Sequence, residues 1–302
     1  MQQLGVSAIH PQAPEFFSAA GLFHRPVDLQ HAIDTLNSIW GVGARPEWAR
    51  INEEAVNRAA ATPDERIPTG SLMHFELNNI RVMLSHVDSP LVPSKGKLPD
   101  HSHYVAITIY APASEHSRPS SSDESPSGTR ADESSAHCAD ESASPSRPER
   151  PEVERRRHAV LAHIILTQLG DALMREPGAL GMYRAELGVV QPPAMFEQLA
   201  PLLTQGQIPL PLWINIRLQT PDLTVGRTLG MPLFGHLDLE IVQSAHTSES
   251  VYAQLANTAT YIIGGDHYLL PGQSVSSLEG EQVAITQAVS SLDASPVIQL
   301  VY

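Results

Sequence analysis

The sequence predicts an α+β fold with a largely antiparallel mixed sheet, helices packed on it, and one long disordered insertion. Strand-like runs occur in hairpins as well as between helices, which favours an antiparallel sheet over a doubly wound parallel one. The chain also lacks the glycine-rich strand-to-helix turn of a dinucleotide fold or a phosphate loop. Residues 112–152 contain twelve Ser, six Pro and nine acidic residues but no Val, Ile, Leu, Met or aromatic residue. This segment cannot bury enough apolar surface to offset the entropy of ordering.

The N-terminal part begins with a predicted helix at 28–40. Its apolar residues recur at the spacing of one helical face, with Asp28 placed to cap its start and Gly41 to end it. A second helix is predicted at 47–60, with Trp48 on its inner face.

A hairpin is predicted next, formed by strands at 72–77 and 80–86. Asn78-Asn79 separates them, and asparagine tolerates the positive φ that a tight hairpin turn requires. The run at 103–110 alternates Val and Ile with Tyr, Ala and Thr, so both of its faces are fairly apolar. That pattern predicts a central strand.

The insertion falls between this strand and the longest predicted helix. We therefore expect residues 1–111 and 153–302 to form a single α+β domain, or two subdomains, interrupted by a disordered segment at 112–152. The remaining predicted elements are helices at 153–174, 193–203 and 248–262, and strands at 181–186, 212–220, 237–242, 282–289 and 297–302. Thr247 or Ser248 is expected to cap the last helix, and Gly264 or Gly265 to adopt the left-handed conformation at its end.

Charge and cysteine content limit the functional classes. The 302-residue chain has a net charge of −14; the insertion contributes −5 of this, which leaves −9 for the remainder. That balance argues against general nucleic-acid binding. The single cysteine, Cys138, excludes a disulfide within the chain and fits a reducing compartment. No signal peptide and no apolar run of membrane-spanning length is visible, so we expect a cytoplasmic protein without membrane contact.

One local cluster of positive charge is Arg155-Arg156-Arg157, at the start of the long helix. The simplest interpretation is that these arginines are solvated there. A phosphate site is the alternative, and the helix dipole at this end disfavours the arginines themselves.

His236, Asp238 and Glu240 are the most suggestive candidate site residues. On a strand they point to one face, and an imidazole with two carboxylates is a sensible set of ligands for a divalent metal. The alternative is an ordinary half-exposed strand, with polar residues outward and apolar ones inward.

His101 and His103 have a second metal-like spacing, at the start of a predicted strand. His86 and Asp88 end an earlier strand, so the two pairs could converge. A solvated loop with scattered histidines is the alternative.

Two runs in the C-terminal half carry a family resemblance. They are PLPLWINIRL at 209–218, and the segment from Thr228-Leu229-Gly230-Met231 through Phe234-Gly235 to Leu239-Glu240-Ile241. Together they resemble the bacterial family called domain of unknown function 4261, which shows an "lPlWv" strand followed by T-x-G-M…G…E-x-E; here the first of those acids is Asp238. The similarity extends more weakly from about residue 70 to the C-terminus. The resemblance implies a bacterial cytosolic protein, and it carries over neither an activity nor catalytic residues.

We therefore expect a non-enzymatic, intracellular binding or interaction module. No G-x-S-x-G, H-E-x-x-H or C-x-x-C motif assembles a nucleophile or a metal, and no cofactor loop occurs. The expected partner is a protein or a small molecule, with no catalytic residue and no cofactor. The alternative is a metal-binding protein or a metal-assisted hydrolase that uses His236, Asp238 and Glu240.

Overall fold

The fold consists of two sheets with helices packed on them. It comes from a computed structural model that describes residues 9–50, 71–94, 96–112, 150–219, 223–277, 280–290 and 292–302. The α+β class and the mostly antiparallel pairing predicted from the sequence are confirmed. Most of the segment predicted to be a disordered insertion, including Cys138, lies outside the described residues.

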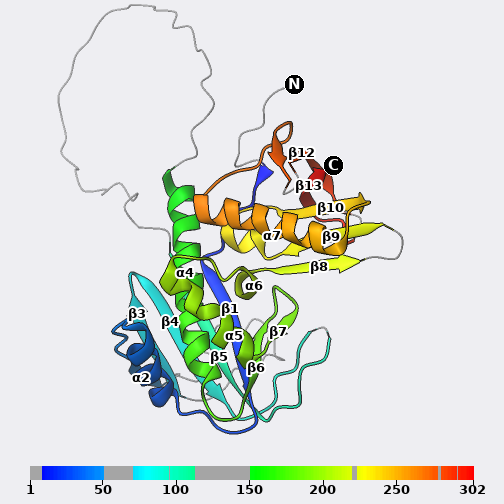
Figure 1. The fold of residues 1–302 in the computed structure, drawn as a ribbon. Coiled ribbons are helices and arrows are strands. Elements are labelled where there is room, and N and C mark those ends of the chain that lie inside the picture. Colours follow the sequence, from blue (N-terminus) through cyan, green and yellow to red (C-terminus); the bar gives the residue numbers. More distant parts are fainter. Residues whose placement is uncertain are drawn as a thin grey trace, which may run out of the picture.

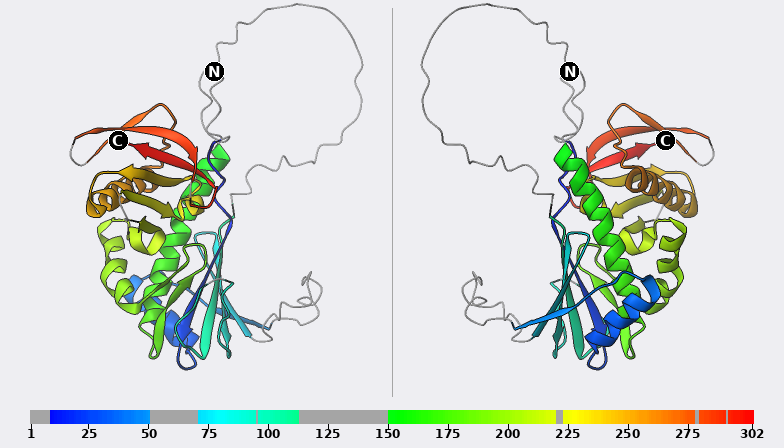
Figure 2. Two further views of the ribbon diagram at one scale, coloured as in Figure 1. Left: turned by 90° about the vertical axis from the view of Figure 1, so that its right-hand side faces the viewer. Right: turned by 90° about the vertical axis from the view of Figure 1, so that its left-hand side faces the viewer.

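The first sheet has seven strands in the order β2-β3-β4-β5-β1-β6-β7 (Figure 1). Its strands are β1 (Phe16–Phe23), β2 (Glu47–Arg50), β3 (Ser71–Leu77), β4 (Ile80–Val87), β5 (His103–Tyr110), β6 (Ala179–Arg184) and β7 (Val189–Gln191). Three helices lie on the same side of it (Figure 2), namely α2 (Leu29–Trp40), α4 (Arg150–Met174) and α5 (Pro193–Leu199).

The second sheet has six strands in the order β11-β12-β13-β10-β9-β8. They are β8 (Asn215–Gln219), β9 (Thr224–Leu229), β10 (Asp238–Ser244), β11 (Ser274–Ser276), β12 (Gln282–Val289) and β13 (Pro296–Val301). Helix α7 (Ser248–Gly265) crosses β8, β9 and β10 on one face (Figure 1). The short helices η1 (Ala200–Gln205), α6 (Leu210–Trp213) and η2 (Met231–Phe234) lie in the connections before and within this sheet.

Helix α4 connects the two halves of the molecule. It packs on β1 and β6 of the first sheet, and near its other end on η2 (Figure 1). His163, 1% exposed, lies on this helix between Phe17 of β1, at 4.8 Å between ring centroids, and Phe234 of η2, at 4.3 Å. Buried apolar residues of both sheets accordingly form one continuous hydrophobic cluster.

Several local predictions are confirmed. The carboxylate of Asp28 accepts hydrogen bonds from Gln30 N at 3.0 Å and His31 N at 3.1 Å, and Gly41 ends α2 with φ of 62°. Asn78 and Asn79 both have positive φ, 51° and 65°, in the β3–β4 turn.

Other predictions are wrong. Residues 47–50 form strand β2 and not the start of a helix; the rest of that predicted helix, 51–60, lies outside the described residues. Trp48 is 55% exposed, so the apolar spacing there did not mark a buried helical face. Helix α7 extends through Gly264 and Gly265, and Asp266 takes the left-handed conformation instead, with φ of 51°. Aspartate tolerates this region better than most residues do.

Candidate functional site

Asp238 and Glu240 face an arginine rather than solvent. They lie on β10 on the face opposite α7, and Glu240 lies directly across from Arg227 of β9 in the strand register. The Arg227 guanidinium donates to Asp293 Oδ1 at 2.6 Å and to Ser290 Oγ at 2.9 Å, and it lies 3.8 Å from Asp238 Oδ2. Both acids are buried, so the half-exposed strand that was the alternative interpretation does not form.

Asp238 is also held by its own local hydrogen bonds. Its Oδ1 accepts from Thr228 Oγ1 and from Met231 N, both at 3.1 Å. Burial raises the pKa of this carboxyl to about 6, and the hydrogen bond from Met231 and the charge of Arg227 oppose the rise. Glu240 accepts a short hydrogen bond from the Ser290 hydroxyl. These contacts join β9, β10 and the β12–β13 turn through one ionic network.

His236 belongs to a different group of side chains. It precedes β10, is 2% exposed, and packs against His10 and Tyr268, with ring centroids at 5.7 and 5.1 Å. Burial, followed by the nearby His10 and Arg156, lowers the pKa of His236 to about 3, so its imidazole is neutral.

The structure therefore does not bring the predicted metal ligands together as a binding site. Within the described residues, no group of three or more His, Cys, Asp or Glu side chains is arranged to hold a metal ion. The metal hypothesis stays a prediction. Elemental analysis of the purified protein tests it, together with the melting temperature before and after a chelator.

The histidines near β5 also separate. His101 is buried and fastens a loop, because its Nε2 accepts from Leu91 N at 2.8 Å and its Nδ1 lies 2.7 Å from Pro99 O. His103 Nδ1 lies 2.9 Å from Asp88 Oδ1, and its ring stacks on His86 at 5.4 Å. The expected convergence with His86 and Asp88 thus occurs for His103 but not for His101.

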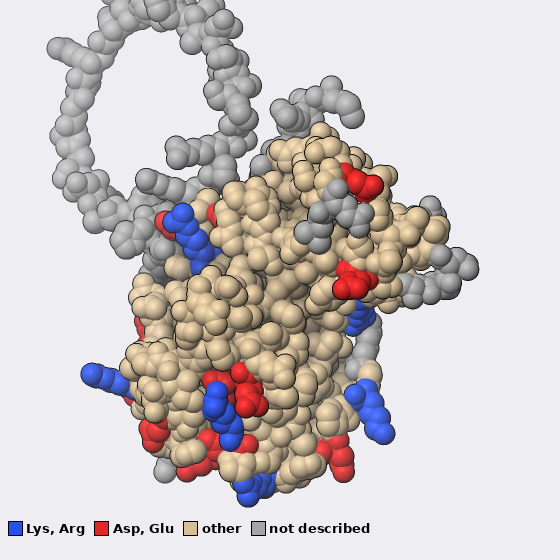
Figure 3. Space-filling model, in the orientation of Figure 1, with Lys and Arg blue, Asp and Glu red and all other residues tan. Residues whose placement is uncertain are grey.

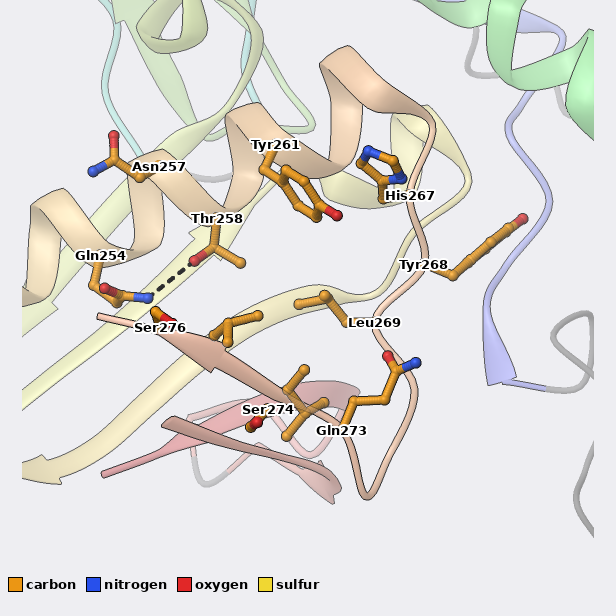
Figure 4. A pocket seen from close by; sticks show the side chains of 12 residues that line it. Gln254, Asn257, Thr258, Tyr261, His267, Tyr268, Leu269, Gln273, Ser274 and Ser276 are labelled. Carbon is orange, nitrogen blue, oxygen red and sulfur yellow. Dashed lines mark hydrogen bonds between the residues drawn. The ribbon is translucent and has the colours of Figure 1, made fainter. Parts of the chain in front are cut away.

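A cavity of about 640 Å³ lies between α7 and the β11–β12 hairpin (Figure 4). Its floor is apolar, with Leu269 4% and Ile285 1% exposed. Its walls come from α7 and from the chain between His267 and Ser276. The wall residues are Gln254, Asn257, Thr258, Tyr261, His267, Tyr268, Gln273, Ser274, Val275 and Ser276.

Two polar side chains on the buried face of α7 mark this cavity. Gln254 and Thr258 are only 4% and 6% exposed, and Gln254 Nε2 donates to Thr258 Oγ1 at 3.3 Å (Figure 4). They take the place of apolar residues on a helical face that otherwise buries Val251, Leu255 and Ile262. At the opening, the ring of Tyr261 stacks on His267 at 4.2 Å, while Tyr268 points away toward His10 (Figure 4).

The geometry defines a two-sheet α+β protein with a polar, uncharged cavity in its C-terminal half. Residues 227–301 match the model of the family described as Domain of unknown function (DUF4261), so this segment of the chain carries that family's domain. No curated protein and no solved structure matches the chain. Within the described residues, every helix is too short or too polar to span a bilayer.

The match confirms the family that the sequence suggested. The run at 209–218 and the weaker similarity from about residue 70 precede the matched segment, so for them the relationship stays a prediction. All residues that line the α7–β11 cavity fall within 227–301. The cavity therefore lies within the matched segment of this chain.

Sequence reasoning missed this cavity. The signal that could have found it was the pair Gln254 and Thr258, four residues apart on the apolar face of a predicted helix. The other wall is β11, which has three residues and no distinctive pattern.

Proposed function

We propose that this chain is an intracellular binding module whose ligand occupies the cavity between α7 and β11. The observation that carries the proposal is the buried, hydrogen-bonded pair Gln254 and Thr258 at the cavity wall. A buried polar group is stable only when it is hydrogen-bonded, and this pair retains further hydrogen-bonding capacity that a ligand can use.

The composition of the walls supports an uncharged ligand. The lining contains no Asp, Glu, Lys or Arg, and it combines amides and hydroxyls with an apolar floor. Uncharged side chains also predominate over α7 on the face shown in Figure 3. A ligand with several hydroxyl or amide groups and one apolar face complements this surface, and the volume is within the range of small-molecule sites.

Ligand-observed NMR with a fragment library tests the proposal. The library contains uncharged amides and polyols, each matched in shape to a carboxylate and to an amine. We expect the uncharged fragments to bind preferentially. Thr258→Val with Gln254→Leu removes the polar wall at nearly constant volume, so it should abolish this binding.

Thr260→Val is the matched control, because Thr260 is exposed on the same helix and does not line the cavity. The proposal fails if the double variant binds the fragments as well as the wild type does. It also fails if charged fragments bind as well as their uncharged counterparts.

A further inference from the structure

A second cavity, of about 310 Å³, lies where α4 meets the end of α7. It is on the other side of the chain turn at 264–268 from the α7–β11 cavity, and the two cavities share no lining residue. Its lining has three apolar side chains, Val160, Phe234 and Ile263. The charged and polar side chains are Arg156, Arg157, His236 and Asp266, and Gly264 and Gly265 contribute backbone.

Arg156 has a structural role in this lining. Its guanidinium pairs with both carboxylate oxygens of Asp266, donates to the Tyr268 hydroxyl, and lies 4.6 Å from the centre of the Tyr268 ring. The prediction that these arginines are solvated is therefore wrong for Arg156, which is only 5% exposed. Its charge and that of Asp266 neutralise each other.

Arg157, the next residue, supplies the positive charge of the cavity. Its side chain is exposed, and it makes no ion pair or hydrogen bond to any described residue. Since the Arg156–Asp266 pair is neutral, the formal charge of the lining is +1. An arginine can bind a carboxylate or a phosphate through two parallel hydrogen bonds.

His236 supplies an unsatisfied polar atom. It is 2% exposed, it lines the cavity, and its Nδ1 is buried without a hydrogen-bond partner among the described residues. Such atoms are rare in folded proteins, because each one left unpaired costs free energy. The neutral ring can donate to a ligand oxygen from this nitrogen in the tautomer that carries its proton on Nδ1, and the ligand reaches it by displacing the side chains that close the atom to solvent.

We propose that this cavity binds a small organic oxyanion, with Arg157 and His236 holding its charged group and Val160, Phe234 and Ile263 contacting its apolar body. The cavity is larger than an inorganic anion needs, and its apolar residues favour a ligand with a hydrocarbon portion. Carboxylates and phosphate monoesters share this chemistry.

Isothermal titration at constant ionic strength tests the proposal with four probes. Benzoate and phenyl phosphate carry both parts of the ligand, acetate carries the charge alone, and benzamide is the uncharged analogue of benzoate. We expect benzoate or phenyl phosphate to bind at least about tenfold more tightly than acetate and benzamide. The tighter of the two identifies the carboxylate or the phosphate as the preferred group.

Variants locate the site. Arg157→Ala should weaken binding of the preferred probe about tenfold or more, and Arg157→Lys should retain part of it because lysine keeps the charge without the planar fork. Arg155→Ala is the matched control, because Arg155 contacts Gln12 and Glu15 outside this cavity.

Two results would overturn the proposal. One is equal affinity for benzoate, phenyl phosphate and benzamide; the other is an unchanged affinity in Arg157→Ala. Thr258→Val serves as a separate check, since a ligand of the α7–β11 cavity would respond to it and a ligand held by Arg157 would not.

Discussion

The two sheets share an order of elements but differ in the direction of one strand. In each, a strand is followed by a helix and then by antiparallel strands that lead back to the first strand. The sets are β1, α2 and β2–β5 in the first sheet, and β10, α7 and β11–β13 in the second. β5 is antiparallel to β1, whereas β13 is parallel to β10. The second sheet has one strand fewer in its returning run, which reverses the direction of the last strand.

The central strands also differ in what they bury. On β5, the inward residues Val105, Ile107 and Ile109 are all apolar. On β10, Leu239 and Ile241 form an apolar face, while Asp238 and Glu240 bury charge on the other. An apolar face accepts any partner of suitable shape, but a buried charge requires particular partners. The comparison therefore predicts that stability in the second sheet depends on a few specific contacts.

Arg227→Met should cause the largest loss of stability, because it leaves the buried Asp238 without its cation and removes the hydrogen bonds to Ser290, Asp293 and Ser295. Breaking a buried ion pair from one side costs about 3–5 kcal/mol. The corresponding change in the apolar centre of the first sheet, Ile107→Val, should cost about 1 kcal/mol. Urea denaturation of both variants measures the two differences.

Asp293→Asn is the control for this network, because its side chain is 51% exposed and its loss should cost far less. If Arg227→Met and Ile107→Val destabilise the protein equally, the buried ionic network on β10 contributes no more to stability than the apolar face of β5 does.

The next largest effect should come from pH, through three histidines that are buried and neutral. Burial lowers the pKa of His10 to about 4 and the pKa values of His163 and His236 to about 3. In the unfolded chain their pKa values are near 6.5, so the unfolded state binds more protons below that pH. Stability should therefore fall as the pH falls from about 6.5 toward 4.

Asp238 acts in the opposite direction, since its pKa of about 6 in the folded protein lies above its unfolded value of 3.8. Its stabilising contribution is complete below pH 3.8 and is lost as the pH rises through 6. Together, these three histidines and Asp238 should lower the free energy of unfolding by about 4 kcal/mol between pH 7 and pH 5. Urea denaturation at both pH values measures it; a constant or rising stability would contradict the neutral, buried state of the histidines.

Elements with strong local signals could be predicted, and elements that depend on distant contacts could not. The run at 282–289 and the Asn78-Asn79 turn carry their own patterns, and both appear where predicted. β1 was missed because its centre, Ser-Ala-Ala-Gly, has little strand propensity. This strand is ordered by pairing with β5 and β6, which are at least 80 residues away in sequence.

For the candidate site residues, too, the sequence predicts local geometry but not the distant contacts. Alternation along β10 correctly places Asp238 and Glu240 on one face, but it does not reveal that Arg227 and the β12–β13 turn cover that face. His236 shares the sequence spacing and yet packs against His10, which is 226 residues earlier in the chain. Spacing specifies which side chains share a face, and only tertiary contacts decide what they meet.

Gly226 in the second sheet and Gly21 in the first differ in how closely other side chains approach them. A Cβ added to Gly226 of β9 would lie 2.7 Å from Val251 and 2.9 Å from both Leu218 and Leu255, because α7 packs closely there. At Gly21 of β1, a Cβ would crowd only the far edge of the Phe23 ring, at 2.9 Å. Gly226→Ala should therefore destabilise the protein by about 1–3 kcal/mol, and Gly21→Ala by less.

Thermal unfolding of the two glycine variants makes this test, with circular dichroism to confirm that both fold. An equal shift in melting temperature would show that α7 can move away from β9 at little cost.

The smallest expected difference concerns the caps of the equivalent helices α2 and α7. The carboxylate of Asp28 accepts from two backbone N–H groups, and its charge also favours the positive end of the helix dipole. Thr247 Oγ1 is neutral and accepts from Ser250 N alone, at 3.2 Å. Asp28→Ala should cost about 1–2 kcal/mol and Thr247→Ala about 0.5–1 kcal/mol, measured by urea denaturation.

Asp28→Ser keeps an acceptor without the charge, so its stability should lie between those of the wild type and Asp28→Ala. A larger loss for Thr247→Ala than for Asp28→Ala would mean that α7 depends on its cap more than α2 does, despite its closer packing on the sheet.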